Sequence, residues 1–314
     1  MAETPTLDTS LFEEAHGPDK SPLAFVVYVL FRGLLGTFAR LPWAFSEGLV
    51  NVLSFLAVRV DRRHTEAARD FIRTAFPELD RAAVEARVRE SYRHFARVAL
   101  ESHRMLVRVP LDRLREHYTY EFVGEARELL DRREGLVIAS AHVGNWEAGT
   151  IGMHALGTHE FYGVAKPVKN NFISRFVYRS RERRGVFILP RRGAMTAAPK
   201  IVGGAGILAL LLDQRARVKP VIAPFFGRPA RCDRSVGVLL RRLDAPVLLS
   251  VCYRTERPMH FRFVCGPVIP ASELSALNPV QVSTRINQEL ERMIRVAPDQ
   301  YFWLHDRYKD ADQA

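Results

Sequence analysis

Apolar residues are concentrated in the first part of the chain and interrupted there by single charges. From Pro22 to Val60 the sequence is largely apolar, but the longest uncharged runs, 21–31 and 48–58, each contain 11 residues. That is short of the roughly 18–20 residues that a membrane-spanning helix requires. Because Pro42 should end the first helix, we predict two short helices, over 21–61, that lie in the membrane interface. A pair of core helices, or a tilted spanning helix with Arg32 reaching the interface, is the alternative.

The next segment has helical periodicity throughout. Residues 62–106 carry two apolar stripes separated by Pro77. The second stripe places Tyr92, Phe95, Ala96 and Leu100 at positions i, i+3, i+4 and i+8, which share one face of a helix. The first third of the chain is therefore predicted to be helical.

After residue 118 short apolar runs alternate with helical patterns. The predicted strands are 118–123, 136–140, 161–165, 207–212, 246–253 and 259–264. The predicted helices are 125–133, 148–156, 172–184, 236–243 and 282–296. Strands that alternate with helices of 8–15 residues indicate an α/β fold, with a sheet covered by helices on both sides.

The net positive charge of the chain indicates the kind of partner that it binds. The formal net charge is +11, and 40 of the 46 basic residues are arginines. Such an excess favours an anionic partner, such as nucleic acid, anionic lipid, nucleotide phosphates or an acidic carrier protein, although genomic base composition also enriches arginine. Residues 1–20 are polar and acidic and lack the pattern of a signal peptide. Three cysteines without metal-binding spacing fit a reduced, cytoplasm-facing protein in which all three are buried or inert.

The segment Ala139–Glu147, ASAHVGNWE, follows the predicted strand 136–140. Strand ends of this kind bind ligands in open α/β sheets. On one helix His142 and Glu147 would lie about 140° apart, so they can meet only if the chain turns between them. Gly144 permits such a turn, and Asn145 is a plausible N-cap of the next helix. We therefore expect the Glu147 carboxylate to orient the His142 imidazole, which leaves one ring nitrogen free as a general base.

No nucleophile accompanies this pair. The sequence has no GxSxG motif, and no cysteine lies nearby, so a covalent acyl-enzyme is not indicated. A histidine–carboxylate pair of this kind suits direct attack of an acceptor hydroxyl on an activated acyl carbonyl. A hydrogen-bonded core histidine is the alternative interpretation.

The HVGNWE element resembles the HX4(D/E) box of glycerolipid acyltransferases, and more closely the bacterial lipid A (lauroyl/myristoyl) acyltransferase family. The resemblance extends over roughly residues 65–310. It includes AFPE at 75–78, YRHFARVALE at 92–101, RERRG at 181–185, the GG…LLLDQ stretch at 203–214, FFGRPA at 225–230, DAPV at 244–247 and WLHDRYK at 303–309.

This resemblance implies a mixed, largely parallel sheet flanked by helices, as in glycerol-3-phosphate acyltransferase, and an acyltransferase domain over 62–310. It implies that His142 is the catalytic base and Glu147 its partner. It further implies a substrate-binding arginine about 37 residues after the histidine, at Arg179, and an acid at the end of a later strand, at Asp213. Asn145 and Arg183 complete the expected substrate-binding set, in which the arginines hold phosphate groups or the oxyanion.

The implied reaction is transfer of a fatty acyl chain to a hydroxyl of a membrane lipid such as a lipid A precursor. Acyl-CoA and acyl carrier protein are both compatible with the basic sequence as donor, and no metal or other cofactor is expected. The expected location is the cytoplasmic face of the bacterial inner membrane, on an anionic surface, with peripheral or monotopic attachment.

Three other interpretations have weaker support. The Gly204–Ala209 segment matches GxGxxA, but a helical pattern precedes it and a strand follows, the reverse of a dinucleotide site. His142, His154 and His159 lack metal-binding spacing. A non-catalytic basic protein that binds anionic lipid or nucleic acid is permitted by the charge, but no nucleic-acid motif occurs, and we expect no nucleic-acid partner.

Overall fold

The computed structural model describes residues 18–157 and 160–311. Its helices are α2 (Pro22–Arg40), α3 (Trp43–Val60), α4 (Arg62–Ala75), α5 (Arg81–Arg108), α6 (Ala126–Asp131), α7 (Trp146–Ala155), α8 (Asn171–Glu182), α9 (Arg191–Gly203), α10 (Arg234–Arg242), α11 (Ala271–Ala276) and α12 (Pro279–Val296), with 3₁₀ turns at Leu111–His117 and Pro298–Gln300. Its strands are β1 (Tyr118–Phe122), β2 (Leu136–Ser140), β3 (Phe161–Ala165), β4 (Val186–Pro190), β5 (Ile207–Leu211), β6 (Pro220–Phe225), β7 (Arg228–Asp233), β8 (Val247–Arg254) and β9 (Phe261–Ile269).

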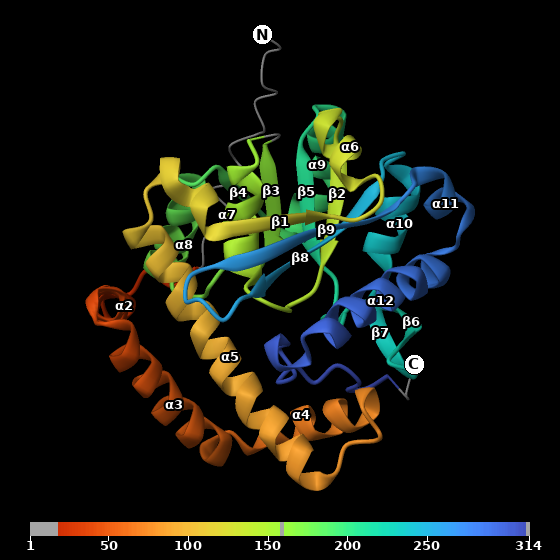
Figure 1. Cartoon of the computed structure of the whole chain (residues 1–314). Coiled ribbons are helices and arrows are strands. Elements are labelled where there is room, and N and C mark those ends of the chain that lie inside the picture. The colour runs from red at the N-terminus through yellow and green to blue at the C-terminus, as the bar shows by residue number, and fades with distance from the viewer. Residues whose placement is uncertain (1–17, 158–159, 312–314) are drawn as a thin grey trace.

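Seven strands form one sheet in the order β1-β9-β8-β2-β5-β3-β4. Only the β8–β9 pair is antiparallel, and the other neighbours run parallel. Figure 1 shows helices on both sides of this sheet. The α/β class and the mixed, largely parallel sheet are therefore confirmed.

Alternating side chains of the central strand enter two separate cores. In β2, Val137 and Ala139 pack with α4, α9 and α12, whereas Leu136 and Ile138 pack with α6 and α7. This alternation follows from the two-residue period of a strand, and both faces are apolar because both are covered. The predicted stripe of α12 is buried as expected: Val282, Ile286, Leu290, Met293 and Ile294.

Strand β4 and the β6–β7 hairpin were not predicted. The FFGRPA segment, 225–230, forms the end of β6, the turn and the start of β7, with Phe226 and Gly227 at positive φ. Its strands contain Pro220, Pro224 and Pro229, which weaken a strand pattern in sequence. A two-stranded sheet outside the main one tolerates these residues because half of its backbone groups need no strand partner.

Helices α2 and α3 are longer than the uncharged runs suggested, with 19 and 18 residues, because the charged residues continue the helices. By length and composition alone both could cross a membrane, and only 11% and 17% of their apolar windows are buried. Figure 1 shows them along the outside of α5 and below α8. The chain bends at Leu41 and Pro42, as Pro42 predicted.

The bend between α2 and α3 is fastened to α5. The Arg104 guanidinium donates to the carbonyl oxygens of Phe38 (3.0 Å) and Leu41 (2.6 Å) and to the Ser46 hydroxyl (2.7 Å). These bonds satisfy carbonyl groups that the end of α2 leaves without helical partners. The hairpin is therefore attached to the α/β unit through polar contacts, while most of its apolar side chains face outward.

Candidate active site

His142 lies in a tight loop between β2 and α7. Gly144 has φ +62°, and a Cβ there would lie 2.0 Å from the carbonyl oxygen of Cys252. The loop backbone is anchored on two sides, because the Gly144 N–H donates to the carbonyl of Gln300 and the Asn145 N–H to that of Cys252, both at 2.7 Å. The turn that was expected at Gly144 is confirmed, and it places the imidazole at the carboxyl edge of the sheet.

Asn145 caps α7 as expected. Its side-chain oxygen accepts from the Ala148 N–H at 2.9 Å, and its amide donates to the Glu101 carboxylate at 3.0 Å. The residue is fully buried. Asn145 is also among the residues expected to bind substrate; in this structure its side chain contacts internal partners and has no exposed surface.

The carboxylate that holds His142 is that of Asp213. Nδ1 of His142 lies 2.8 Å from Oδ1 of Asp213, and the His142 backbone N–H donates to Oδ2 at 3.0 Å. The sheet register explains this pairing. Ser140 of β2 lies opposite Leu211 of β5, so the residues two positions beyond each strand, His142 and Asp213, are level with one another. The family resemblance implies an acid at this strand end, at Asp213, and places it among the substrate-binding residues rather than beside His142.

Charge and burial at Asp213 act in opposite directions. The side chain is 2% exposed, and burial alone would raise its pKa. The positive charge and hydrogen bonds of His142 outweigh that effect and lower the Asp213 pKa to about 2. An ionised Asp213 at neutral pH accepts the Nδ1 proton of the imidazole and leaves Nε2 as the basic nitrogen.

Nε2 of His142 lies on the side of the imidazole ring away from Asp213. The amide nitrogen of Gln214, an exposed residue, lies 3.3 Å away. The ring of Trp146 packs at 5.0 Å between centroids, and Phe302 at 6.2 Å. The imidazole is therefore 15% exposed, held by one carboxylate and two aromatic rings, with its basic nitrogen toward a polar, accessible side chain.

Glu147 does not orient His142, contrary to the prediction. It lies in the first turn of α7, and its carboxylate forms a bidentate pair with Arg181 of α8 at 2.6 to 3.1 Å. The Gly144 turn brings the two segments together, but Nδ1 is already occupied by Asp213. The chain turns at Gly144 as predicted, but the carboxylate that contacts His142 is that of Asp213 and not that of Glu147.

The arginine of this pair is also not the expected one. Arg179 and Arg183, which were assigned to substrate binding, line a separate basic cavity between α8 and α2. Arg181 lies on another side of α8, because two residues turn a helix by about 200°. The crowded run of arginines in α8 contained no sequence signal that singled out Arg181, and the contact with α7 selects it.

An apolar pocket of about 100 Å³ adjoins the loop. It lies between α7 and the ends of β2, β3 and β5. Small residues make room for it, and its polar rim contains Glu147 and Arg181. Its apolar lining includes Ile138, Trp146, Met153, Phe161, Gly163, Ile188, Ala209, Leu211 and Phe263.

The competing sequence interpretations gain nothing from the geometry. Gly204, the C-cap of α9, and Gly206 lie at the turn from α9 into β5, as a helix-to-strand connection requires. Within residues 18–157 and 160–311 no three metal-ligating side chains gather, while His159 lies outside the described residues. All three cysteines are buried and unpaired, as expected.

Comparison with known proteins identifies the family of the chain. The family model described as "Bacterial lipid A biosynthesis acyltransferase" matches residues 20–310. The chain is 21% identical, over 286 residues, to a lipid A biosynthesis palmitoleoyltransferase of Escherichia coli (strain K12) and, at the same identity, to a lipid A biosynthesis acyltransferase of Shigella flexneri. Each match covers 88% of this chain and 89% of the relative. The chain is an acyltransferase and belongs to the bacterial lipid A biosynthesis acyltransferase family.

Proposed function

We propose that this acyltransferase moves a fatty acyl chain from a thioester donor, acyl-CoA or acyl carrier protein, to a hydroxyl of a lipid A precursor or a related glycolipid. The observation that carries the proposal is the His142–Asp213 pair, in which a buried carboxylate holds Nδ1 and leaves Nε2 accessible. The names of the two relatives support the lipid A part of the proposal.

The proposed mechanism has two proton transfers. Nε2 of His142 takes the proton of the acceptor hydroxyl as its oxygen attacks the thioester carbonyl carbon. The resulting imidazolium is stabilised by the ionised Asp213. When the tetrahedral intermediate collapses, the C–S bond breaks and the imidazolium returns the proton to the thiolate. The side-chain amide of Gln214, 3.3 Å from Nε2, is placed to donate to the oxyanion or to the incoming hydroxyl. None of these steps uses a metal or another cofactor.

The apolar pocket between α7 and the sheet is proposed to hold the acyl chain. Its lining reaches Ser140 and Trp146, which lie on either side of the His142 loop. An acyl chain placed there would bring its carbonyl carbon to the mouth of the pocket. Burial of an acyl chain contributes about 0.8 kcal/mol per methylene group, so the pocket favours a thioester donor that carries a fatty acyl chain over one that carries a short polar group.

Glu147 and Arg181 are proposed to position the mouth of that pocket. A bidentate pair fixes the guanidinium plane. The pair joins α7, which begins at the His142 loop, to α8, and so holds the loop against the acyl pocket. In this proposal Glu147 is a positioning residue and does not exchange a proton.

The outward faces of α2 and α3 are proposed to lie on the cytoplasmic leaflet of the inner membrane. Their exposed apolar side chains include Leu23 (72%), Leu30 (67%) and Phe45 (71%). Because these helices are fastened to α5 and carry charged residues within them, an interfacial hairpin over 21–61 attached to an acyltransferase domain over 62–310 accounts for both features.

The test is acyl transfer by the purified chain in detergent micelles, with mass spectrometry of the lipid acceptor. Wild-type protein should add the mass of one acyl group, and His142→Ala should abolish the reaction while keeping its melting temperature. His260→Ala, in the turn between β8 and β9, is the matched control and should retain full activity. Appreciable transfer by His142→Ala would overturn the mechanism.

A further inference from the structure

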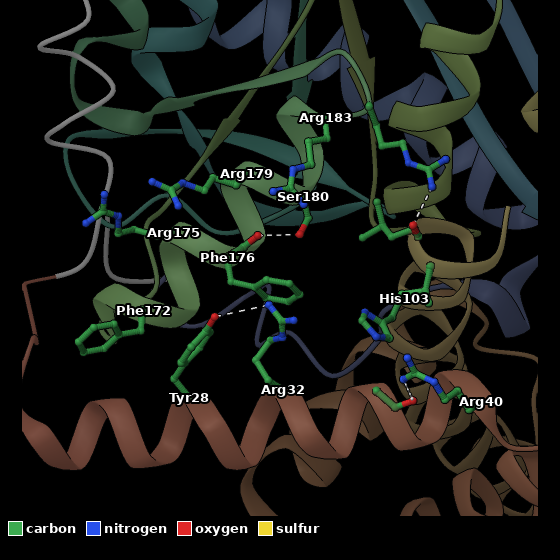
Figure 2. A pocket seen from close by; sticks show the side chains of 14 residues that line it. Tyr28, Arg32, Arg40, His103, Phe172, Arg175, Phe176, Arg179, Ser180 and Arg183 are labelled. Carbon is green, nitrogen blue, oxygen red and sulfur yellow. Dashed lines mark hydrogen bonds between the residues drawn. The ribbon is translucent and has the colours of Figure 1, made fainter. Parts of the chain in front are cut away.

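A second and larger cavity lies between α2, α5 and α8. Its volume is about 730 Å³. The wall from α2 is a stripe of residues at i, i+4, i+8 and i+12, namely Tyr28, Arg32, Gly36 and Arg40. The facing wall from α8 contains Phe172, Arg175, Phe176, Arg179, Ser180 and Arg183, and α5 contributes His103. Figure 2 shows the two helices facing each other across this cavity.

The cavity has a strongly basic lining. Among the residues that the structure describes, six arginines and a histidine line it, and none of the described lining residues is an aspartate or glutamate. In the described part of the chain, no ion pair joins Arg32, Arg40, Arg175, Arg179 or Arg183 to a carboxylate, whereas arginines elsewhere, such as Arg97 and Arg285, have glutamate partners. Clustered cations repel one another, so this arrangement favours a bound anion.

Two residues that line the cavity, Arg184 and His103, each carry a buried nitrogen without a hydrogen-bond partner in the part of the chain that the structure describes. Arg184 is 8% exposed; its Nη2 donates to the carbonyls of Met105, Leu106 and Val109, but its Nη1 has no hydrogen-bond partner among the described residues. The same holds for Nε2 of His103. Burying a polar nitrogen without a partner costs about 1–3 kcal/mol, so these two residues add unsatisfied polar atoms to the arginine-rich wall.

The surroundings of the cavity indicate what kind of molecule carries the anion. The guanidinium of Arg32 stacks on Phe176 at 4.4 Å from the ring centroid, so aromatic and cationic groups alternate along the wall. The other side of α2 exposes Leu23, Leu30 and Leu34 by more than half of their surface. A ligand with an anionic head and an apolar body would satisfy both the basic cavity and the apolar helix that borders it.

We propose that this basic cavity binds the phosphomonoester headgroup of a membrane lipid. A phosphomonoester carries up to two negative charges and three acceptor oxygens, which suits several arginine forks better than the single charge of a phosphodiester. The proposal deepens the proposed function: α8 presents Arg181 to the acyl-transfer site and Arg179 and Arg183 to this cavity, so a lipid held here lies next to the reaction site. Binding itself does not depend on catalysis.

The experiment measures binding of the full chain, in neutral detergent micelles, to dioctanoyl phosphatidic acid by calorimetry, with dioctanoyl phosphatidylglycerol as the phosphodiester comparison. Wild-type protein should prefer phosphatidic acid. Arg175→Gln/Arg179→Gln should weaken its binding about 25-fold, since each arginine near such a surface contributes about fivefold. Arg241→Gln/Arg242→Gln, on the exposed side of α10, removes the same charge and should leave binding unchanged.

Several outcomes separate the interpretations. Equal binding of the two lipids, or equal losses in the two double variants, would overturn a specific phosphomonoester site. Tighter binding of coenzyme A than of phosphatidic acid, lost in the α8 variant, would assign the cavity to a soluble donor and overturn the lipid proposal. His142→Ala should keep wild-type lipid binding, so failed catalysis and failed binding are distinguishable. Arg183→Gln provides a second, independent variant, with an expected loss of about fivefold.

Discussion

The two carboxylates beside the His142 loop lie in different environments. Asp213, beyond β5, is almost completely buried and holds the imidazole, whereas Glu147, on α7, is 30% exposed and holds Arg181. Glu147 is five residues from His142 in the chain and Asp213 is 71 residues away. The difference shows that strand register, rather than distance along the chain, selects the partner of the histidine.

The largest expected effect concerns the buried carboxylate. Asp213→Asn keeps the size of the side chain but removes the charge that stabilises the imidazolium, so the rate of acyl transfer should fall about 10³-fold to 10⁴-fold. The measurement is kcat with the lipid acceptor, alongside the melting temperature. A loss below tenfold would mean that Asp213 has a structural role only and that it is not the carboxylate that supports His142 in catalysis.

The loop that brings both carboxylates near His142 depends on Gly144. Gly144→Ala would place a methyl group against the Cys252 carbonyl at positive φ, so the free energy of unfolding should fall by about 3 kcal/mol or more. Gly157→Ala is the matched control, since it has φ +70° but open space around it, and it should lose about 1 kcal/mol. Denaturant unfolding measures both. Equal losses would show that the loop can move away from Cys252.

Glu147 should matter less than Asp213. Glu147→Gln removes one partner of the Arg181 pair and loosens α7 against α8, which should lower kcat up to about a hundredfold through misplacement of the loop. Because Glu147 exchanges no proton in the proposed mechanism, the pH profile of the residual activity should match that of the wild type. A shift in the pH profile of the residual activity would indicate that Glu147 supports the His142 imidazole, as its spacing in the sequence suggested.

The smallest expected effect is a pH dependence at the Asp213 side of the site. Nε2 of His305 accepts from the Arg215 N–H at 2.9 Å, next to Gln214. Burial lowers the His305 pKa to about 4; Arg307, His142 and Arg215 act in the same direction, and Asp213 opposes them. The unfolded chain therefore binds the proton more readily, and stability present above pH 6.5 is lost as the pH falls toward 4.

His305→Gln retains an acceptor for Arg215 but has no proton to gain. Its stability should decline less between pH 6.5 and 4, by about 1–2 kcal/mol after allowance for partial exposure of the ring. Thermal melting of both proteins across this range is the measurement. If the melting temperatures of the two proteins fall in parallel with pH, protonation of His305 does not cause the loss of stability in acid.

Local patterns in the sequence determined many of the helices and strands and much of the His142 loop. Apolar runs predicted β2, β3 and β5 within one residue, Pro42 marked the bend between α2 and α3, and Gly144 and Asn145 marked the turn and cap at His142. These features depend on backbone preferences and periodicity within a few residues, so they can be predicted without knowledge of the fold.

Which side chains meet was decided only by the tertiary structure. Asp213 reaches His142 because β2 and β5 are parallel neighbours in a fixed register, and Arg181 rather than Arg179 reaches Glu147 because of the rotation of α8 about its axis. The basic cavity likewise exists only because the stripe of α2 is placed against α8. Such pairings depend on the order of strands and the rotation of helices, which are set by burial over the whole chain, so a local pattern can name candidate residues but not their partners.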